Sequence, residues 1–286
     1  MPKSPASSSF KNRAAMRSHR ISFTVALTGI SRAMILRDRV LESVGVVRRM
    51  DASDASASQH SIPSGNNVID AVFVEPSAGS ARASVLICHG IGENVGRWFS
   101  VQRLLAANGV ASLVFDYSGY GRSTGSVDWT QCNVDTLSAF QYLQQLTPHL
   151  PASILGFSLG SGPAAAIAHR VAAHRLVLCA AFTSFRAAVC ATGLPNRLAF
   201  LAPPIWSAQE SLRSCSLPIL VVHGEKDRLF PVKMARELVA LCPGPAELLV
   251  VPGLAHNQPF RKPHLSYWGP IISRIIPERG PELSAD

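Results

Sequence analysis

A short turn in the middle of the chain restricts the possible folds more than any other stretch. Residues 156–160 read Gly-Phe-Ser-Leu-Gly and lie between an apolar run that favours a strand, residues 153–157, and an alanine-rich run that favours a helix, residues 160–170. Glycine is expected at both ends of such a turn because a side chain there would collide with the neighbouring backbone. A strand, a sharp turn and a helix in this order leave Ser158 exposed at the turn, the arrangement called a nucleophile elbow. The N–H of Leu159 would then lie at the start of the helix, where a negatively charged oxygen is stabilised.

The chain from about residue 62 onward alternates between strand-like and helical segments. Strands are predicted at residues 68–75, 84–88, 111–116, 153–157, 175–180, 218–223 and 246–251, and helices near residues 97–107, 131–146, 160–170, 232–241 and 264–275. A hairpin turn at residues 64–67 precedes the first of these strands. Alternation with short connections predicts an α/β fold with a doubly wound, mostly parallel sheet, in one domain from about residue 62 to 277.

One interval between the predicted strands is long. Residues 185–215 include the sequence Leu-Ala-Pro-Pro-Ile-Trp at residues 201–206, but they are too few for a separate cap domain. A stretch of this length in a compact domain is usually a lid or a binding loop. We therefore predict a small lid insertion at residues 185–215.

The net charge of +9 is concentrated at the start of the chain. Residues 1–50 hold ten of the 27 Lys and Arg but only two of the 18 Asp and Glu, which leaves seventeen basic and sixteen acidic side chains for the remaining residues. A body with balanced charge does not indicate nucleic-acid binding. We therefore divide the chain into a basic leader at residues 1–50, a Ser- and Ala-rich linker at residues 51–61, the domain at residues 62–277, and a tail at residues 278–286.

The basic leader has apolar residues at helical spacing between its arginines. They are Leu36, Val40, Val44 and Val47. They would form a basic amphipathic helix that associates weakly with a membrane surface, or a helix packed on the domain, or they would belong to a disordered leader. The apolar patch at residues 21–30 is too short for a membrane span and too polar for a signal peptide.

The six cysteines show neither a Cys-x-x-Cys pair nor the spacing of zinc ligands. Catalysis by a serine nucleophile needs no metal and no other cofactor, so none is expected. Cys88 and Cys179 lie inside apolar strand-like runs, where a buried free thiol is usual. This pattern favours a reducing compartment, so we predict a cytoplasmic protein that is at most peripheral to a membrane. The sequence does not decide the oligomeric state.

Two polar residues near the end of the chain follow predicted strands. Asp227 comes after the strand at residues 218–223, and His256 comes after the strand at residues 246–251. Active sites of open α/β sheets collect at the carboxyl ends of the strands. A serine that attacks an acyl carbon needs a base to take its proton and an acid to orient that base. We therefore predict that Ser158, His256 and Asp227 act together.

Other carboxylates compete for the role of the acid. Asp128 and Asp135 follow no predicted strand, which makes them weaker candidates than Asp227. Glu225 lies in the same loop as Asp227 and remains an alternative from the residues alone.

With these motifs, the chain resembles the α/β-hydrolases, and it is closest in pattern to the serine aminopeptidase (S33)-like and depalmitoylase-like members. The order Ser158, Asp227, His256 is the family's chain order. Residues 89–94, His-Gly-Ile-Gly-Glu-Asn, resemble its oxyanion-hole loop, which implies the N–H of Ile91 as a donor beside that of Leu159.

Two further segments carry the same resemblance. Residues 116–123 resemble the Asp-x-x-Gly-x-Gly-x-Ser turn of these hydrolases, and residues 252–257 are similar to their histidine segment. The chain departs from the depalmitoylases because its first fifty residues contain no cysteine, and from many S33 peptidases because it lacks a large helical cap.

Several polar residues of these motifs have a simpler structural explanation. His89 and His223 each precede a glycine at a strand end, at positions where the family uses backbone groups and not imidazole. We expect both to be structural. We also expect Asp116 and Arg122 to pair and brace the turn at residues 119–121, in preference to binding substrate.

The resemblance implies a serine hydrolase that cleaves acyl esters of a small-molecule substrate through an acyl-enzyme. Thioester hydrolysis and S33-type aminopeptidase activity remain alternatives, as does a non-catalytic binding protein on a hydrolase scaffold. The apolar side chains near the elbow and in the predicted lid favour short to medium acyl groups over charged peptides. These expected pocket residues are Phe157, Leu194, Phe200, Leu201, Ile205 and Trp206.

Overall fold

The structure is a computed structural model that describes residues 55–76, 81–256, 259 and 263–278. The leader predicted at residues 1–50 lies outside the described residues, as does almost all of the tail. The strands are β1 (Ala55–Ser64), β2 (Asn67–Pro76), β3 (Ala83–Cys88), β4 (Val110–Phe115), β5 (Ala152–Phe157), β6 (Leu176–Cys179), β7 (Ile219–Gly224) and β8 (Ala246–Val251). The helices between them are α2 (Val95–Ala107), α3 (Gln131–Leu146), η3 (Ser158–Gly160), α4 (Ser161–Ala168), α5 (Phe185–Ala191), η4 (Asn196–Leu201), α6 (Ala208–Arg213), α7 (Val232–Ala240) and α9 (Leu265–Ile275).

The strands form one eight-stranded sheet in the order β1-β2-β4-β3-β5-β6-β7-β8. Strand β2 runs antiparallel to both of its neighbours, and all the other pairs are parallel. The mostly parallel sheet predicted from the alternating pattern is confirmed. Because the strands from β3 to β8 run in the same direction, their carboxyl ends share one edge.

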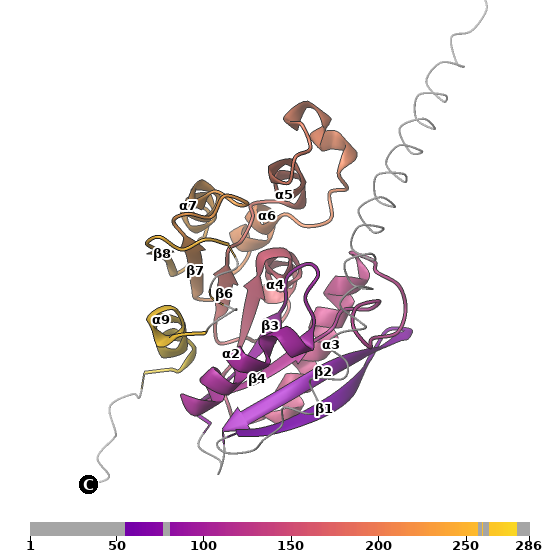
Figure 1. Cartoon of the computed structure of the whole chain (residues 1–286), viewed down its shortest axis with the longest axis vertical. Coiled ribbons are helices and arrows are strands. Elements are labelled where there is room, and N and C mark those ends of the chain that lie inside the picture. Colours follow the sequence, from indigo (N-terminus) through magenta and orange to yellow (C-terminus); the bar gives the residue numbers. More distant parts are fainter. Residues whose placement is uncertain (1–54, 77–80, 257–258, 260–262, 279–286) are drawn as a thin grey trace, which may run out of the picture.

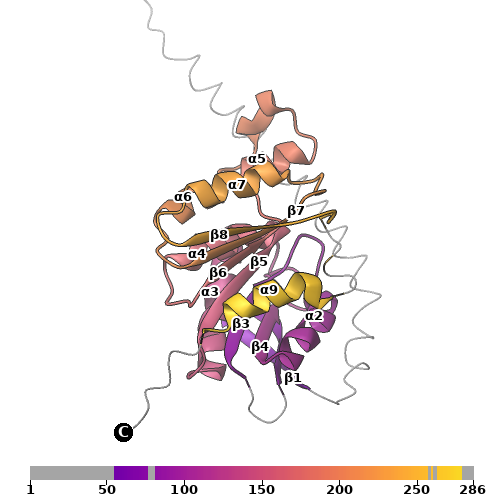
Figure 2. The ribbon, with the colours of Figure 1, turned by 90° about the vertical axis from the view of Figure 1, so that its left-hand side faces the viewer.

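Helices cover both faces of the sheet (Figures 1 and 2). Apolar side chains of α2 and α9 pack into one core, and those of α3, α4, α6 and α7 pack into the other. Neighbouring residues of a strand point to opposite faces, so Ile154 belongs to one core and Leu155 to the other. Both faces of β5 are therefore buried, which explains its mostly apolar sequence.

The prediction of a linker at residues 51–61 is wrong for residues 55–61, because these residues belong to β1. Strand β1 pairs with β2 along its full length, from Ala55 opposite Pro76 to Ser64 opposite Asn67. An edge strand is held by backbone hydrogen bonds on one side, so a polar Ser- and Ala-rich sequence can form it. The hairpin turn is confirmed, with Gly65 at a φ of 57°.

The interval at residues 185–215 contains three short helical segments, α5, η4 and α6. Its base is closed by an antiparallel bridge between Ser184 and Ser207, and the backbone N–H of Phe185 donates to the carbonyl of Trp206. The segment around α5 projects from the body beside α7 (Figure 1), and η4 has no buried residue. Its role as a lid stays a prediction. In the part of the chain that the structure describes, no helix has the length and apolarity that crossing a membrane requires.

Candidate active site

Ser158 is the first residue of η3, at the sharp turn after β5 and at the carboxyl edge of the sheet. The prediction that Ser158 is exposed at this turn is wrong, because the residue is only 6% exposed. Its φ is +50°, a left-handed conformation that non-glycine residues rarely adopt. The flanking glycines make this turn possible. A Cβ on Gly156 would lie 2.6 Å from the carbonyl oxygen of Gly160, and a Cβ on Gly160 would overlap the carbonyl group of Cys88. The expectation that both positions require glycine is confirmed.

The three side chains predicted to act together are in contact. Oγ of Ser158 lies 2.9 Å from Nε2 of His256, and Nδ1 of His256 lies 2.7 Å from Oδ2 of Asp227. A carboxylate accepts hydrogen bonds, so the proton of His256 that faces Asp227 lies on Nδ1. Nε2 is then free to accept the hydroxyl proton of Ser158.

Asp227 is held at the end of β7 by its own loop. Its Oδ1 accepts the backbone N–H groups of Leu229 and Phe230, both at 2.9 Å. Burial alone would raise the pKa of Asp227, but the hydrogen bonds from His256 and from the N–H of Phe230 hold that pKa below its ordinary value. The carboxyl group is therefore ionised at neutral pH and suited to orient an imidazole.

The rival carboxylates have other partners. Oε2 of Glu225 accepts the N–H of Gly253 at 2.8 Å. Asp128 accepts two backbone N–H groups at the start of α3. Asp135 is buried on α3, where it accepts hydrogen bonds from Ser64, Ser118 and Gln131. Asp227 is the carboxylate that contacts His256.

His223 is a buried neighbour of Asp227. The ring is 1% exposed, and its Nε2 donates to the carbonyl of Phe230 at 2.7 Å and lies 3.5 Å from Oδ2 of Asp227. Burial is the main cause that lowers the pKa of His223. These contacts match the structural role predicted for this histidine. The ring of Phe230 lies 5.2 Å from that of His256, a contact that no sequence signal indicated.

The predicted oxyanion donors lie in two different segments. Ile91 occupies the turn closed by the N–H of Glu93 on the carbonyl of Gly90, at 3.4 Å, and its N–H makes no hydrogen bond with any described residue. Leu159 is the second residue of η3, and the first N–H groups of a helix have no acceptor within it. The assignment of both as donors stays a prediction.

The expected pocket residues lie in different environments. Phe157 is buried, and its ring lies 5.4 Å from that of His256. Trp206 is buried at the base of the interval at residues 185–215, where it packs against Trp129 and Phe185. Trp206 is therefore a core residue. The other expected pocket residues of this interval are more accessible. Phe200 is 43% exposed, and Leu194, Leu201 and Ile205 are half-buried.

The turn after β4 differs from the prediction in its ion pair. Arg122 contacts Asp70 of β2, with Nε 3.3 Å from Oδ2, and not Asp116. The turn is instead closed by Ser123, whose hydroxyl donates to the carbonyl of Asp116 at 2.6 Å and accepts the N–H of Asp70.

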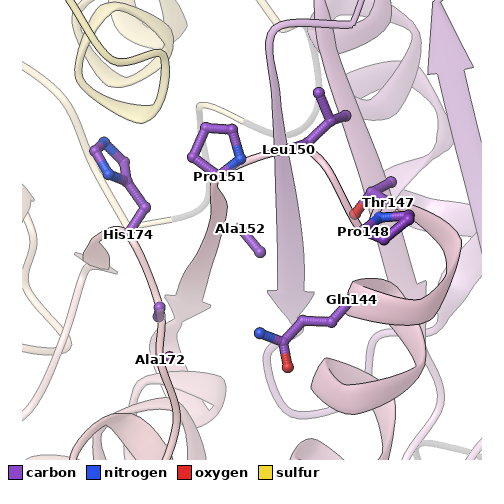
Figure 3. A pocket seen from close by; sticks show the side chains of 9 residues that line it. Gln144, Thr147, Pro148, Leu150, Pro151, Ala152, Ala172 and His174 are labelled. Atoms are coloured by element: carbon purple, nitrogen blue, oxygen red, sulfur yellow. The ribbon is translucent and has the colours of Figure 1, made fainter.

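A hollow at the opposite edge of the sheet is not part of this site. It lies where β5 begins, between Thr147, Ala152 and His174 (Figure 3). Ser158 lies at the other end of the same strand.

Comparison with known proteins places the chain in a family. A family model described as serine aminopeptidase, S33, matches residues 79–207. An uncharacterised protein of Mycobacterium tuberculosis is 32% identical over 191 residues, which cover 65% of this chain and 67% of that protein. The chain belongs to the α/β-hydrolase superfamily, in its serine aminopeptidase (S33) family.

Other α/β-hydrolases are more distant. The lysophosphatidylserine lipase ABHD12 of Macaca fascicularis is 27% identical over 192 residues, which cover 60% of this chain. The chain spans about half the length of that relative, 48%. The solved esterase Pf2001 of Pyrococcus furiosus superposes with a TM-score of 0.60 at 18% identity, covering 77% of this chain and 90% of the esterase. The α/β-hydrolase fold expected from the motifs is thus confirmed.

Proposed function

We propose that this protein hydrolyses carboxylic esters with Ser158 as the nucleophile. The observation that carries the proposal is the continuous contact from Ser158 through His256 to Asp227, at 2.9 and 2.7 Å, on a turn where Ser158 has a strained φ of +50°. Strain of this kind persists where the surroundings enforce it, commonly at active sites.

The reaction follows from the roles that these atoms can take. Oγ of Ser158 attacks the carbonyl carbon while Nε2 of His256 takes the hydroxyl proton, and Asp227 stabilises the imidazolium that forms. The tetrahedral oxyanion accepts hydrogen bonds from the N–H groups of Ile91 and Leu159. The C–O bond to the alcohol then breaks, and the leaving alkoxide takes the proton from His256. Water attacks the acyl-enzyme by the same route, which releases the carboxylic acid and restores Ser158.

Esters are favoured over peptides because the carboxylates near the site already accept hydrogen bonds from the protein and do not face a substrate ammonium group. An aminopeptidase needs an acidic group for the free ammonium of its substrate. In the described part of the site, Asp227 and Glu225 accept backbone N–H groups, and Glu93 accepts the N–H of Gly90 and the indole N–H of Trp98. Relatives named as esterases and as a lysophosphatidylserine lipase agree with an ester substrate that carries one acyl chain. Thioesters remain the alternative leaving-group chemistry.

A fluorophosphonate probe tests the nucleophile directly. The wild-type protein should be labelled, and Ser158→Ala should lose both labelling and hydrolysis while keeping its melting temperature. Ser153→Ala is the matched control, because this buried serine lies in β5, the strand that Ser158 directly follows, and its hydroxyl has no partner in the described structure. Labelling of Ser158→Ala at another serine would overturn the assignment.

The substrate class needs a separate panel. We expect p-nitrophenyl esters of short and medium chains, and a lysophospholipid, to be turned over faster than an acyl thioester or an aminoacyl anilide. Faster turnover of the anilide than of the esters would mean that the protein is an aminopeptidase and not the proposed esterase.

A further inference from the structure

A cavity of about 420 Å³ lies between α5, η4 and the start of α7, which are neighbours in Figure 1. This volume is large enough for a small organic group. Much of the lining is apolar, and it includes Ala187 on α5 and Met234 on α7. Among the described residues that line the cavity, Arg186 is the only charged side chain. The cavity therefore combines an apolar wall with one positive charge.

Arg186 has no counter-ion in the part of the chain that the structure describes. Its side chain is half-buried, and its Nε donates to the carbonyl of Ala202 at 3.2 Å. A carbonyl does not neutralise the charge, and arginines that leave the surface are normally paired with an anion. The surrounding sequence adds no acid, because residues 185–209 contain two arginines and no Asp or Glu. The other N–H groups of the guanidinium are thus available to an anion that enters the cavity.

The cavity adjoins the part of the site that receives the leaving alcohol. Pro231 lines the cavity and directly follows Phe230, whose ring lies 5.2 Å from that of His256. In the proposed reaction, the leaving alkoxide takes its proton from Nε2 of His256. The alcohol half of the ester must therefore lie beside this imidazole, and its far end can extend past Phe230 to the cavity.

We propose that Arg186 determines specificity by selecting esters whose alcohol carries a phosphate or a carboxylate. The carbon skeleton of the alcohol contacts the apolar wall, and the guanidinium binds the anion. The planar fork of arginine suits both anions, because each can accept two parallel hydrogen bonds from it. This inference rests on the proposed ester hydrolysis, and it names the half of the substrate that the contact of Ser158 with His256 leaves undefined.

The test uses three hexanoyl esters that share the acyl chain and the carbon skeleton of the alcohol. The alcohols are glycerol, which is neutral, glycerol 3-phosphate and glyceric acid. The short acyl chain keeps the esters dissolved as single molecules, so binding to a lipid surface does not contribute. We would measure kcat and KM of each ester for the wild type and for Arg186→Gln, Arg186→Lys and Arg186→Glu. Arg197→Gln is the matched control, because Arg197 is an exposed arginine of the same interval that does not line the cavity.

The wild type should prefer at least one anionic ester over the neutral ester by about tenfold in kcat/KM, since hydrogen bonds to charged groups are strong. The anion is remote from the reacting carbon, so the preference should lie mainly in KM. Arg186→Gln should raise KM for the anionic ester by about tenfold and leave the neutral ester within about twofold. Arg186→Lys should keep part of the preference, and Arg186→Glu should reverse it. About 0.5 M NaCl should weaken the preference of the wild type. The ester with the larger preference identifies the anion as phosphate or carboxylate.

Four outcomes would overturn the inference. The wild type could hydrolyse all three esters equally well, or its preference could survive in Arg186→Gln. Equal losses on all three esters would show that Arg186 only holds α5 against Ala202. An equal loss of preference in Arg197→Gln would assign the effect to the overall surface charge. If Arg186→Gln fails to fold, Arg186→Lys and the salt dependence of the wild type decide. Fluorophosphonate labelling and hydrolysis of the neutral ester test the proposed function separately, so the two failures are distinguishable.

Discussion

The prediction that tests the oxyanion hole most directly is the removal of a single N–H by Ile91→Pro. Residues 90–93 form a turn in which the N–H of Glu93 donates to the carbonyl of Gly90 and Gly92 has a φ of 70°. Positive φ at the third residue is typical of a type II turn, and such turns favour proline at the second position, which is Ile91. Proline should therefore fit the backbone and remove only the N–H.

The size of the effect follows from what the N–H would contribute. Losing one oxyanion donor costs about 2.7–4 kcal/mol in the transition state, which lowers kcat by roughly 100- to 1000-fold. Folding should change little, because the Ile91 side chain is already 40% exposed and its N–H has no partner among the described residues. We expect the melting temperature to shift by no more than about 4 °C, the effect of about 1 kcal/mol in a domain of this size.

Ile91→Ala is the control, because it removes the same side chain and keeps the N–H. Steady-state kinetics on a p-nitrophenyl ester, with thermal unfolding of each variant, should give wild-type kcat for the alanine variant and the large loss for the proline variant. A folded proline variant with wild-type kcat would show that the Ile91 N–H does not bind the oxyanion. Equal losses in both variants would assign the effect to the side chain.

Three further predictions use other parts of the chain. Asp227→Asn should lower kcat by about 10⁴-fold, by analogy with removal of the triad aspartate elsewhere, whereas Glu225→Gln should leave kcat near wild type; the reverse ranking would move the acid to Glu225. Burial raises the pKa of Asp70 to about 6 despite Arg122, so the folded state binds a proton there more readily than the unfolded state, and stability should fall as pH rises from about 4 through 6. Asp70→Asn should remove this pH dependence of stability. After allowing for solvent screening, it should also raise the free energy of unfolding at pH 8 by about 1 kcal/mol, measured by urea titration. An unchanged pH dependence would contradict the raised pKa of Asp70. Removing residues 1–54 should preserve ester hydrolysis and weaken salt-sensitive binding to anionic vesicles. Removing residues 1–60 also cuts β1 and should lower the melting temperature. Equal melting temperatures of the two truncated proteins would contradict a contribution of β1 to stability.

The elements buried on both faces could be predicted from sequence to within a residue or two. Strands β3, β5 and β7 are mostly apolar because helices cover both of their faces, so the pattern and the burial have the same cause. The segment at residues 55–61 has no such signal. It forms an edge strand because its backbone pairs with β2, and its own side chains do not show this pairing in the sequence. Composition alone could not distinguish it from a linker.

The site could be predicted where position along the chain implies position in space. Ser158, Asp227 and His256 each follow a parallel strand, and the carboxyl ends of such strands meet at one edge. The pairing of Arg122 with Asp70 could not be predicted in this way, because it depends on how β2 lies beside the turn after β4. The sequence predicts Trp206 as a pocket residue because it is apolar and lies within residues 185–215, but the burial of its side chain depends on what packs around it, here Trp129 and Phe185.

The strain at the elbow leads to a last prediction about stability. A non-glycine residue in the left-handed region costs roughly 1–2 kcal/mol, and Ser158 has a φ of +50°. Ser158→Gly and Ser158→Ala both remove the hydroxyl, and both should be inactive. Glycine relieves the strain but loses about 0.5–1 kcal/mol through the greater freedom of the unfolded chain, so a net gain of about 0.5–1 kcal/mol over alanine remains. Urea unfolding of the two variants measures this difference. Equal stability, or a more stable alanine variant, would mean that the turn carries no net strain, and the left-handed serine could then no longer support the assignment of the nucleophile.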